Sequence, residues 1–70
     1  MLDFLLSLKD EDGKDISYDE ADILYEIISN FIENTDEESD DIVRSVAMII
    51  LDRGFVFDYD ELVLHIQDEL

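Results

Sequence analysis

The side chains that could do chemistry in this chain are nearly all carboxylates. Its 70 residues include 21 Asp and Glu against four Lys and Arg, so the formal net charge is −17. There is one histidine, His65, and no cysteine, which leaves few nucleophiles or bases for catalysis. Carboxylates at this density suit the binding of a positively charged partner. We therefore expect a binding protein, with no enzyme activity, no cofactor and no dedicated metal site.

The density of negative charge approaches that of DNA. A compact chain of this length has a diameter of roughly 28 Å, and duplex DNA carries roughly 16 or 17 charges over that length. Soluble domains need a net charge of magnitude only ~2–8 to stay in solution. The excess predicts a partner with a basic surface, such as a nucleic-acid-binding protein. Nucleic acid itself and anionic membrane surfaces would be repelled.

The elements that must position these carboxylates are predicted to be helices. The chain has no proline, only two glycines and 47% apolar residues, which favours a single folded all-α domain over residues 1–70. We predict a bundle of about four helices, the first one short and the first loop at residues 10–15. The expected ranges are 2–9, 18–33, 36–53 and 58–69.

Local signals indicate where these helices begin and end. Capping signatures begin at Ser17, Thr35 and Asp58, each with a Glu three residues later. Gly54 is predicted to end the third helix. In the second helix, apolar residues recur at helical spacing and form a face that is expected to be buried. Ile23 and Ile27 are expected to widen this face. The other apolar residues of that face are Ala21, Leu24, Tyr25, Ile28, Phe31 and Ile32.

Acidic residues form a stripe on the second predicted helix and a cluster at the start of the third. Asp19, Asp22, Glu26 and Glu33 lie at i, i+3, i+7 and i+14, on one side of a helix whose neighbouring turns are about 4.5–6 Å apart along the axis. Acidic residues also favour helix N-termini, which explains single clusters but not the total charge. The predicted partner-binding residues are Asp19, Asp22, Glu26, Glu33, Asp36, Glu37, Asp40 and Asp41.

In size, charge and acidic stripes the chain resembles the acidic DNA-mimic inhibitors of phages and mobile elements. These include anti-restriction and anti-CRISPR proteins and uracil-DNA glycosylase inhibitors, and the resemblance involves no shared motif. It implies that carboxylates replace phosphates in the Lys/Arg groove of a nuclease or other DNA-binding protein. Association would be fast through electrostatic steering, and Tyr18 and Tyr59 would supply apolar anchors.

Location and oligomeric state are expected to be simple. The longest apolar run, residues 46–51, is far shorter than the ~20 residues of a membrane span, and the first residues lack a basic leader. We expect a cytoplasmic protein, in the host cytoplasm if a phage encodes it. We expect a monomer, with a dimer as the open alternative because the first and third helices expose apolar positions on several sides.

Other functions stay open from the sequence. A bacteriocin-type immunity protein is also small, acidic and helical, and binds a basic toxin; other acidic protein-binding modules fit as well. The loop 10–15 is similar to an EF-hand loop, but Gly13 falls at position four instead of six. Ser39 resembles the modified serine of acyl carrier proteins without its flanking Asp and Leu. His65 shares a helix face with Glu61 and Glu69, a spacing that can bind a metal ion.

The net charge generates a testable expectation for stability. Like-charge repulsion opposes the compact state, and raising the salt concentration from about 0.01 M to about 1 M shortens the Debye length from about 30 Å to about 3 Å. We expect the melting temperature, followed by circular dichroism, to be higher in high salt than in low salt. A melting temperature that ignores salt would contradict the role given to repulsion.

Overall fold

The computed structural model describes residues 1–69, and these form four helices, as the sequence predicted. A short helix α1 (Leu2–Leu6) precedes three longer helices, α2 (Tyr18–Asn34), α3 (Ser39–Asp52) and α4 (Tyr59–Glu69). Two short strands, β1 (Lys9–Asp10) and β2 (Phe55–Val56), complete the order α1–β1–α2–α3–β2–α4. The molecule is elongated, with extents of 34 × 21 × 20 Å.

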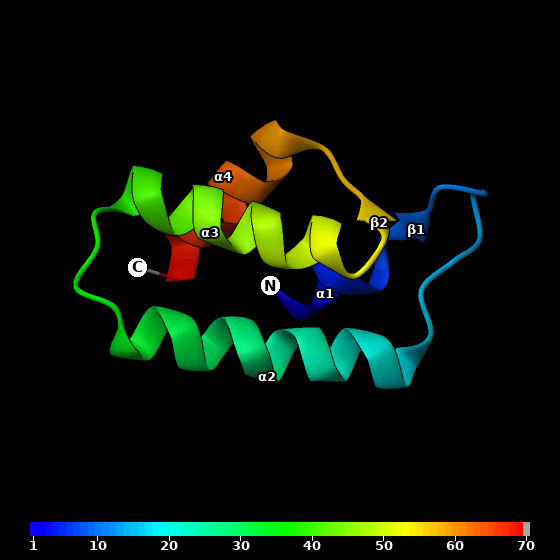
Figure 1. The fold of residues 1–70 in the computed structure, drawn as a ribbon, viewed down its shortest axis with the longest axis horizontal. Coiled ribbons are helices and arrows are strands. Elements are labelled where there is room, and N and C mark those ends of the chain that lie inside the picture. Colours follow the sequence, from blue (N-terminus) through cyan, green and yellow to red (C-terminus); the bar gives the residue numbers. More distant parts are fainter. Residues whose placement is uncertain (70) are drawn as a thin grey trace.

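Helix α2 forms one long side of the molecule. In Figure 1 it runs along the bottom, with α3 above it and α4 behind α3. Helix α1 contacts both α2 and α4, and α3 contacts both α2 and α4, whereas the described residues of α2 and α4 do not pack directly against each other. Among the described elements, α1 and α3 cover α2, so one face of α2 is buried, with Phe31 and Ile32 partly buried beside it, and the opposite face meets solvent.

The two strands are the element that the sequence interpretation did not predict. They pair antiparallel, with Lys9 opposite Val56 and Asp10 opposite Phe55. This pairing also ends the first helix at Leu6, three residues before the expected end. Leu8 is buried in the core, so the chain has to leave the helix to bury Leu8 and then pair with β2. Two-residue strands have no detectable period, and their partner lies far along the sequence.

The core is entirely apolar. Every helix contributes to it, and none of the described residues that are buried is polar or charged. Unpaired buried charges are very costly, so the described carboxylates are left to the surface. The buried residues are Phe4, Leu5, Leu8, Ile16, Ala21, Leu24, Ile28, Ile42, Val43, Val46, Ala47, Ile50, Leu62 and Ile66.

Two of the three capping predictions and the glycine stop are confirmed. The Ser17 hydroxyl accepts a hydrogen bond from the Glu20 N–H at 3.2 Å, and the Asp58 carboxylate accepts one from the Asp60 N–H at 3.0 Å. Gly54 follows α3 with a φ of 87°, a left-handed conformation that suits glycine.

The predicted start of the third helix at Thr35 is wrong. Thr35 is instead the C-cap of α2, and its hydroxyl accepts a hydrogen bond from the Glu37 N–H at 3.1 Å in a local turn. Helix α3 begins at Ser39 with Glu38 as its N-cap. Residues 35–38 connect the end of α2 to the start of α3, so the Thr35 hydroxyl stabilises a turn in this connection and does not cap the N-terminus of α3.

The core assignment predicts unequal effects for two leucine truncations. Leu24 is fully buried, whereas Leu64 on α4 is 63% exposed. Leu24→Ala should lower the free energy of unfolding by about 2–5 kcal/mol because it leaves a cavity. Leu64→Ala should change it by less than about 0.5 kcal/mol. Urea denaturation measures both, and equal effects would contradict the observed packing.

Candidate functional site

Four carboxylates form an acidic ridge on the solvent side of α2. The ridge consists of Asp19, Asp22, Glu26 and Glu33, all exposed. At 3.6 residues per turn the four fall within a sector of about 60°, and they span about 21 Å along the helix axis. The buried residues of α2, among them Leu24 and Ile28, lie on the opposite side. The predicted stripe on one side of this helix is therefore present as an exposed feature.

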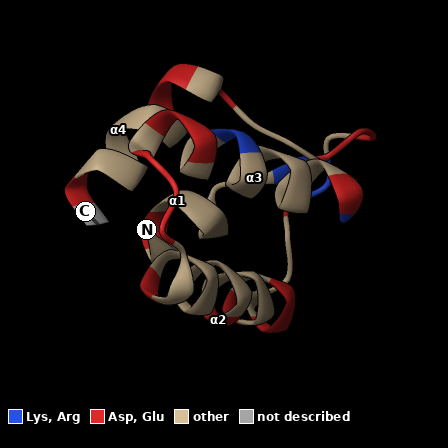
Figure 2. Ribbon diagram, turned by 60° about the vertical axis from the view of Figure 1, so that its left-hand side comes forward, with Lys and Arg blue, Asp and Glu red and all other residues tan. Residues whose placement is uncertain are grey.

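The ridge is not neutralised by nearby cations. Residues 15–43 contain eleven carboxylates and no Lys or Arg. Of the acidic residues of α2, Glu20 makes an ion pair, with Arg53 at 3.0 Å; none of the ridge residues has an ion-pair partner among the residues described. In Figure 2, α2 accordingly carries acidic but no basic residues, and the basic ones lie on other elements.

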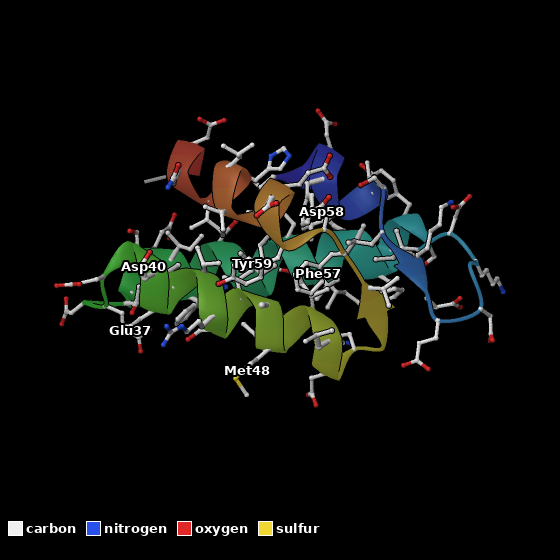
Figure 3. All side chains as sticks on the ribbon, turned by 90° about the horizontal axis from the view of Figure 1, so that it is seen from above. Glu37, Asp40, Met48, Phe57, Asp58 and Tyr59 are labelled. Carbon is white, nitrogen blue, oxygen red and sulfur yellow. The ribbon has the colours of Figure 1, made fainter. Side chains whose placement is uncertain are left out.

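The other four predicted contact residues lie around the end of the molecule where α2 connects to α3. Asp36, Glu37, Asp40 and Asp41 are all exposed, and Figure 3 shows Glu37 and Asp40 at that end. Consecutive helical residues point about 100° apart, so Asp40 and Asp41 face different sides of α3. These residues wrap around the end of the molecule, whereas the α2 ridge follows one line.

Three apolar residues of α2 that the sequence placed in its buried face are exposed instead. Tyr25, which lines a cavity beside α2, is 37% exposed. Ile23 and Ile27 are 43% and 37% exposed on the flank beside the ridge. None of the described elements covers that flank of α2, which explains the difference for Ile23 and Ile27. Both residues border the ridge at helical spacing, and Tyr18, also exposed, lies at the start of the same helix. Tyr59 is exposed on α4 and therefore on a different part of the molecule.

The acidic loop between β1 and α2 uses its first carboxylate to close a turn. The Asp10 carboxylate accepts hydrogen bonds from the N–H groups of Asp12 and Lys14, both at 2.9 Å. Gly13 has a φ of 82°, and Lys9 pairs with Asp15. Asp10 is thus a structural residue of the loop, and the described residues include no group of three side chains placed to hold a metal ion.

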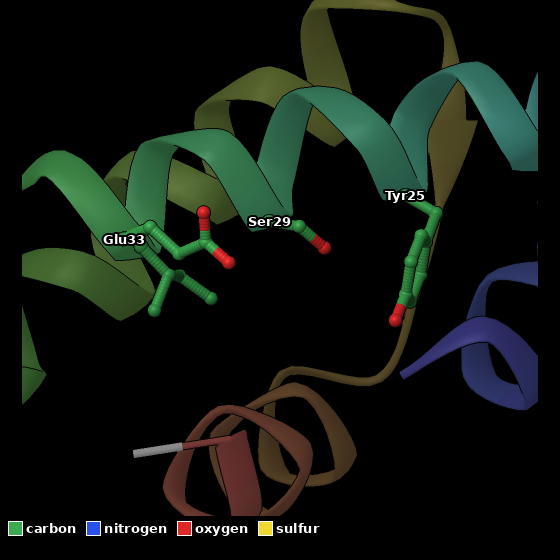
Figure 4. A pocket seen from close by; sticks show the side chains of 4 residues that line it. Tyr25, Ser29 and Glu33 are labelled. Atoms are coloured by element: carbon green, nitrogen blue, oxygen red, sulfur yellow. The ribbon is translucent and has the colours of Figure 1, made fainter.

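The remaining candidate groups are His65 and the residues that line a cavity beside α2. His65 packs against the Phe4 ring, with the ring centroids 5.0 Å apart, and the side chain of Glu69 lies outside the described residues. A cavity of about 310 Å³ is lined by Tyr25, Ser29, Ile32 and Glu33 (Figure 4). All four belong to α2, and they include neither a histidine nor a pair of carboxylates.

Comparison with protein-family models, with curated proteins and with solved structures finds no match to this chain. Among the described residues, no helix has the length and apolar character needed to cross a bilayer.

The structural role of Asp10 can be tested with two substitutions. Asp10→Ala removes the acceptor of two backbone hydrogen bonds and should lower the free energy of unfolding by about 1 kcal/mol or more. Asp10→Asn keeps an oxygen acceptor, and Asn suits such turns, so it should retain most of the stability. Urea denaturation would contradict the assignment if the two variants were equally stable.

Proposed function

We propose that this protein binds a basic, nucleic-acid-binding protein and blocks its nucleic-acid site. The carrying observation is the α2 ridge: four exposed carboxylates on one line with no cation partner among the described residues. Exposed carboxylates held together without cations repel one another and lower stability. A basic surface that approaches the ridge relieves this repulsion.

The length of the ridge fits a groove built for a phosphate backbone. Over the roughly 21 Å from Asp19 to Glu33, one DNA strand presents about six phosphates at ~3.4 Å per step along the axis. The ridge alone has fewer charges than that strand. The exposed acidic residues 36–41, where the chain turns from α2 into α3, continue the negative surface beyond Glu33.

Apolar residues beside the ridge supply what carboxylates alone cannot. Exposed ion pairs contribute little net affinity, whereas buried apolar and aromatic anchors dominate binding energy. Ile23 and Ile27 flank the ridge and are partly exposed, and Tyr18 stands at its start. In the proposed complex the carboxylates steer the encounter and set the register, and these side chains are desolvated against the target.

The same apolar flank favours one second candidate, a toxin-directed immunity protein. In that case the α2 surface would contact a basic toxin outside the groove that holds nucleic acid. The two functions share the α2 surface and differ in whether the target can still bind nucleic acid in the complex.

Charge reversal on the ridge tests the proposal. The protein is immobilised and exposed to a lysate of the cells in which its gene resides, and captured proteins are identified by mass spectrometry. We expect the captured target to be a nucleic-acid-binding protein. The affinity of this protein for that target should fall by about 100-fold when Asp22, Glu26 and Glu33 are all changed to Lys. The target should lose its nucleic-acid binding when the wild-type protein is added.

A matched control separates the ridge from net charge. Glu11 and Asp12 in the loop before α2 and Asp68 on α4 are exposed and belong to other segments than the ridge, and changing all three to Lys alters the net charge by the same amount. This variant should capture the target nearly as well as the wild type, and circular dichroism should show both variants folded. Equal losses for the two triple variants would mean that the ridge is not the contact surface.

A further inference from the structure

The outer face of α3 exposes apolar side chains away from the acidic ridge. Met48 is 71% exposed and Leu51 is 57% exposed, while the opposite face of α3 is buried in the core. Figure 3 shows Met48 pointing away from the body of the molecule. Beside it lies a hollow of about 350 Å³ lined by Met48, Ile49 and Asp52. This face has the shape of a contact surface, a projecting side chain next to a depression.

Opposite charges flank Met48 at equal distances along the helix. Arg44 lies four residues before it and Asp52 four residues after it, so both are within about 6 Å of Met48 along the axis. Both are exposed, and neither has an ion-pair partner among the described residues, in contrast to Lys9 and Arg53. The pattern of cation, apolar centre and anion is complementary to the same pattern on a second, antiparallel copy of the helix.

We propose that this face binds the same face of a second copy of the chain, with the two α3 helices antiparallel about a two-fold axis near Met48. The axis brings Arg44 of each copy to the level of Asp52 of the other. Two identical ion pairs then flank a central contact in which each Met48 enters the hollow of its partner. An isologous interface requires such a self-complementary pattern.

Charge explains why two copies would meet at α3. Two chains of net charge −17 repel over most of their surfaces, and the segment 15–43, which contains the ridge, has no basic residue at all. The outer face of α3 combines an unpaired arginine with exposed apolar area. A dimer formed there leaves both α2 ridges accessible, so self-association and target binding are compatible.

The area available predicts a weak, salt-dependent dimer. The exposed surface of the chain is 4731 Å², and a contact of about a tenth of it per copy buries roughly 900 Å² in total, below the size of stable interfaces. Long-range repulsion between the copies is screened by salt. The dimer should therefore be reversible and should strengthen as salt is raised.

Sedimentation equilibrium of the purified protein tests the pairing through a charge swap. Arg44→Asp and Asp52→Arg should each weaken dimerisation by about tenfold, because each variant places like charges opposite one another twice. The double variant R44D/D52R restores both ion pairs in reverse, and its dissociation constant should return to near the wild-type value. All four proteins are compared at about 0.5 M salt, where repulsion is largely screened.

The Asp52→Arg variant separates specific pairing from net charge. It makes the chain less negative, so simple repulsion predicts tighter association, whereas the proposed interface predicts weaker association. Asp12→Arg changes the charge equally in the distant loop and should leave dimerisation unchanged or slightly stronger. The proposal is overturned if the wild type stays monomeric at every salt concentration, if Asp52→Arg dimerises as well as the wild type, or if the double variant is not restored.

Discussion

Repulsion among carboxylates is the constraint on which the rest of this structure depends. A net charge of −17 on 70 residues opposes compaction, and no cysteine is available to form a disulfide. Folding rests on fourteen described residues that are buried and entirely apolar. Because none of these is charged, the carboxylates are confined to the surface and crowd there. The interior is thus strictly apolar and the exterior strongly negative, and each helix has a buried apolar side and an exposed polar side.

The few cations are distributed unevenly over the molecule, so some of its surfaces are partly neutralised and others are not. Lys9 pairs with Asp15, and Arg53 pairs with Glu20, so both pairs involve the strands or the residues next to them. Among the described residues, the ridge on α2 and the connection to α3 receive no such compensation. The ion pairs and the turn at Asp10 stabilise the end of the molecule that carries the strands. The α2 ridge and the connection to α3 keep a negative electrostatic potential that can attract a basic partner. The outer face of α3 differs from both because it joins Arg44 to exposed apolar area.

Features set by neighbouring residues were predictable, and those set by distant contacts were not. Ser17, Asp58 and Gly54 act within one turn of the chain, so the sequence predicted their roles. The antiparallel pairing of Lys9 with Val56 joins segments far apart, and no local signal predicts it. Ile23 and Ile27 are apolar at helical spacing, but only the positions of α1 and α3 decide that this flank stays open. Likewise, the ridge followed from spacing alone, whereas the missing cation partners and the apolar flank required the fold.

In the proposed complex, carboxylates on α2 occupy the place of phosphates in the target. Competition on a purified target measures this directly: the apparent dissociation constant of the protein is determined at increasing concentrations of duplex DNA that the target binds. Mutually exclusive binding predicts that this constant rises in proportion to the DNA concentration without reaching a limit. A plateau, which indicates that protein and DNA occupy the target together, would contradict the account.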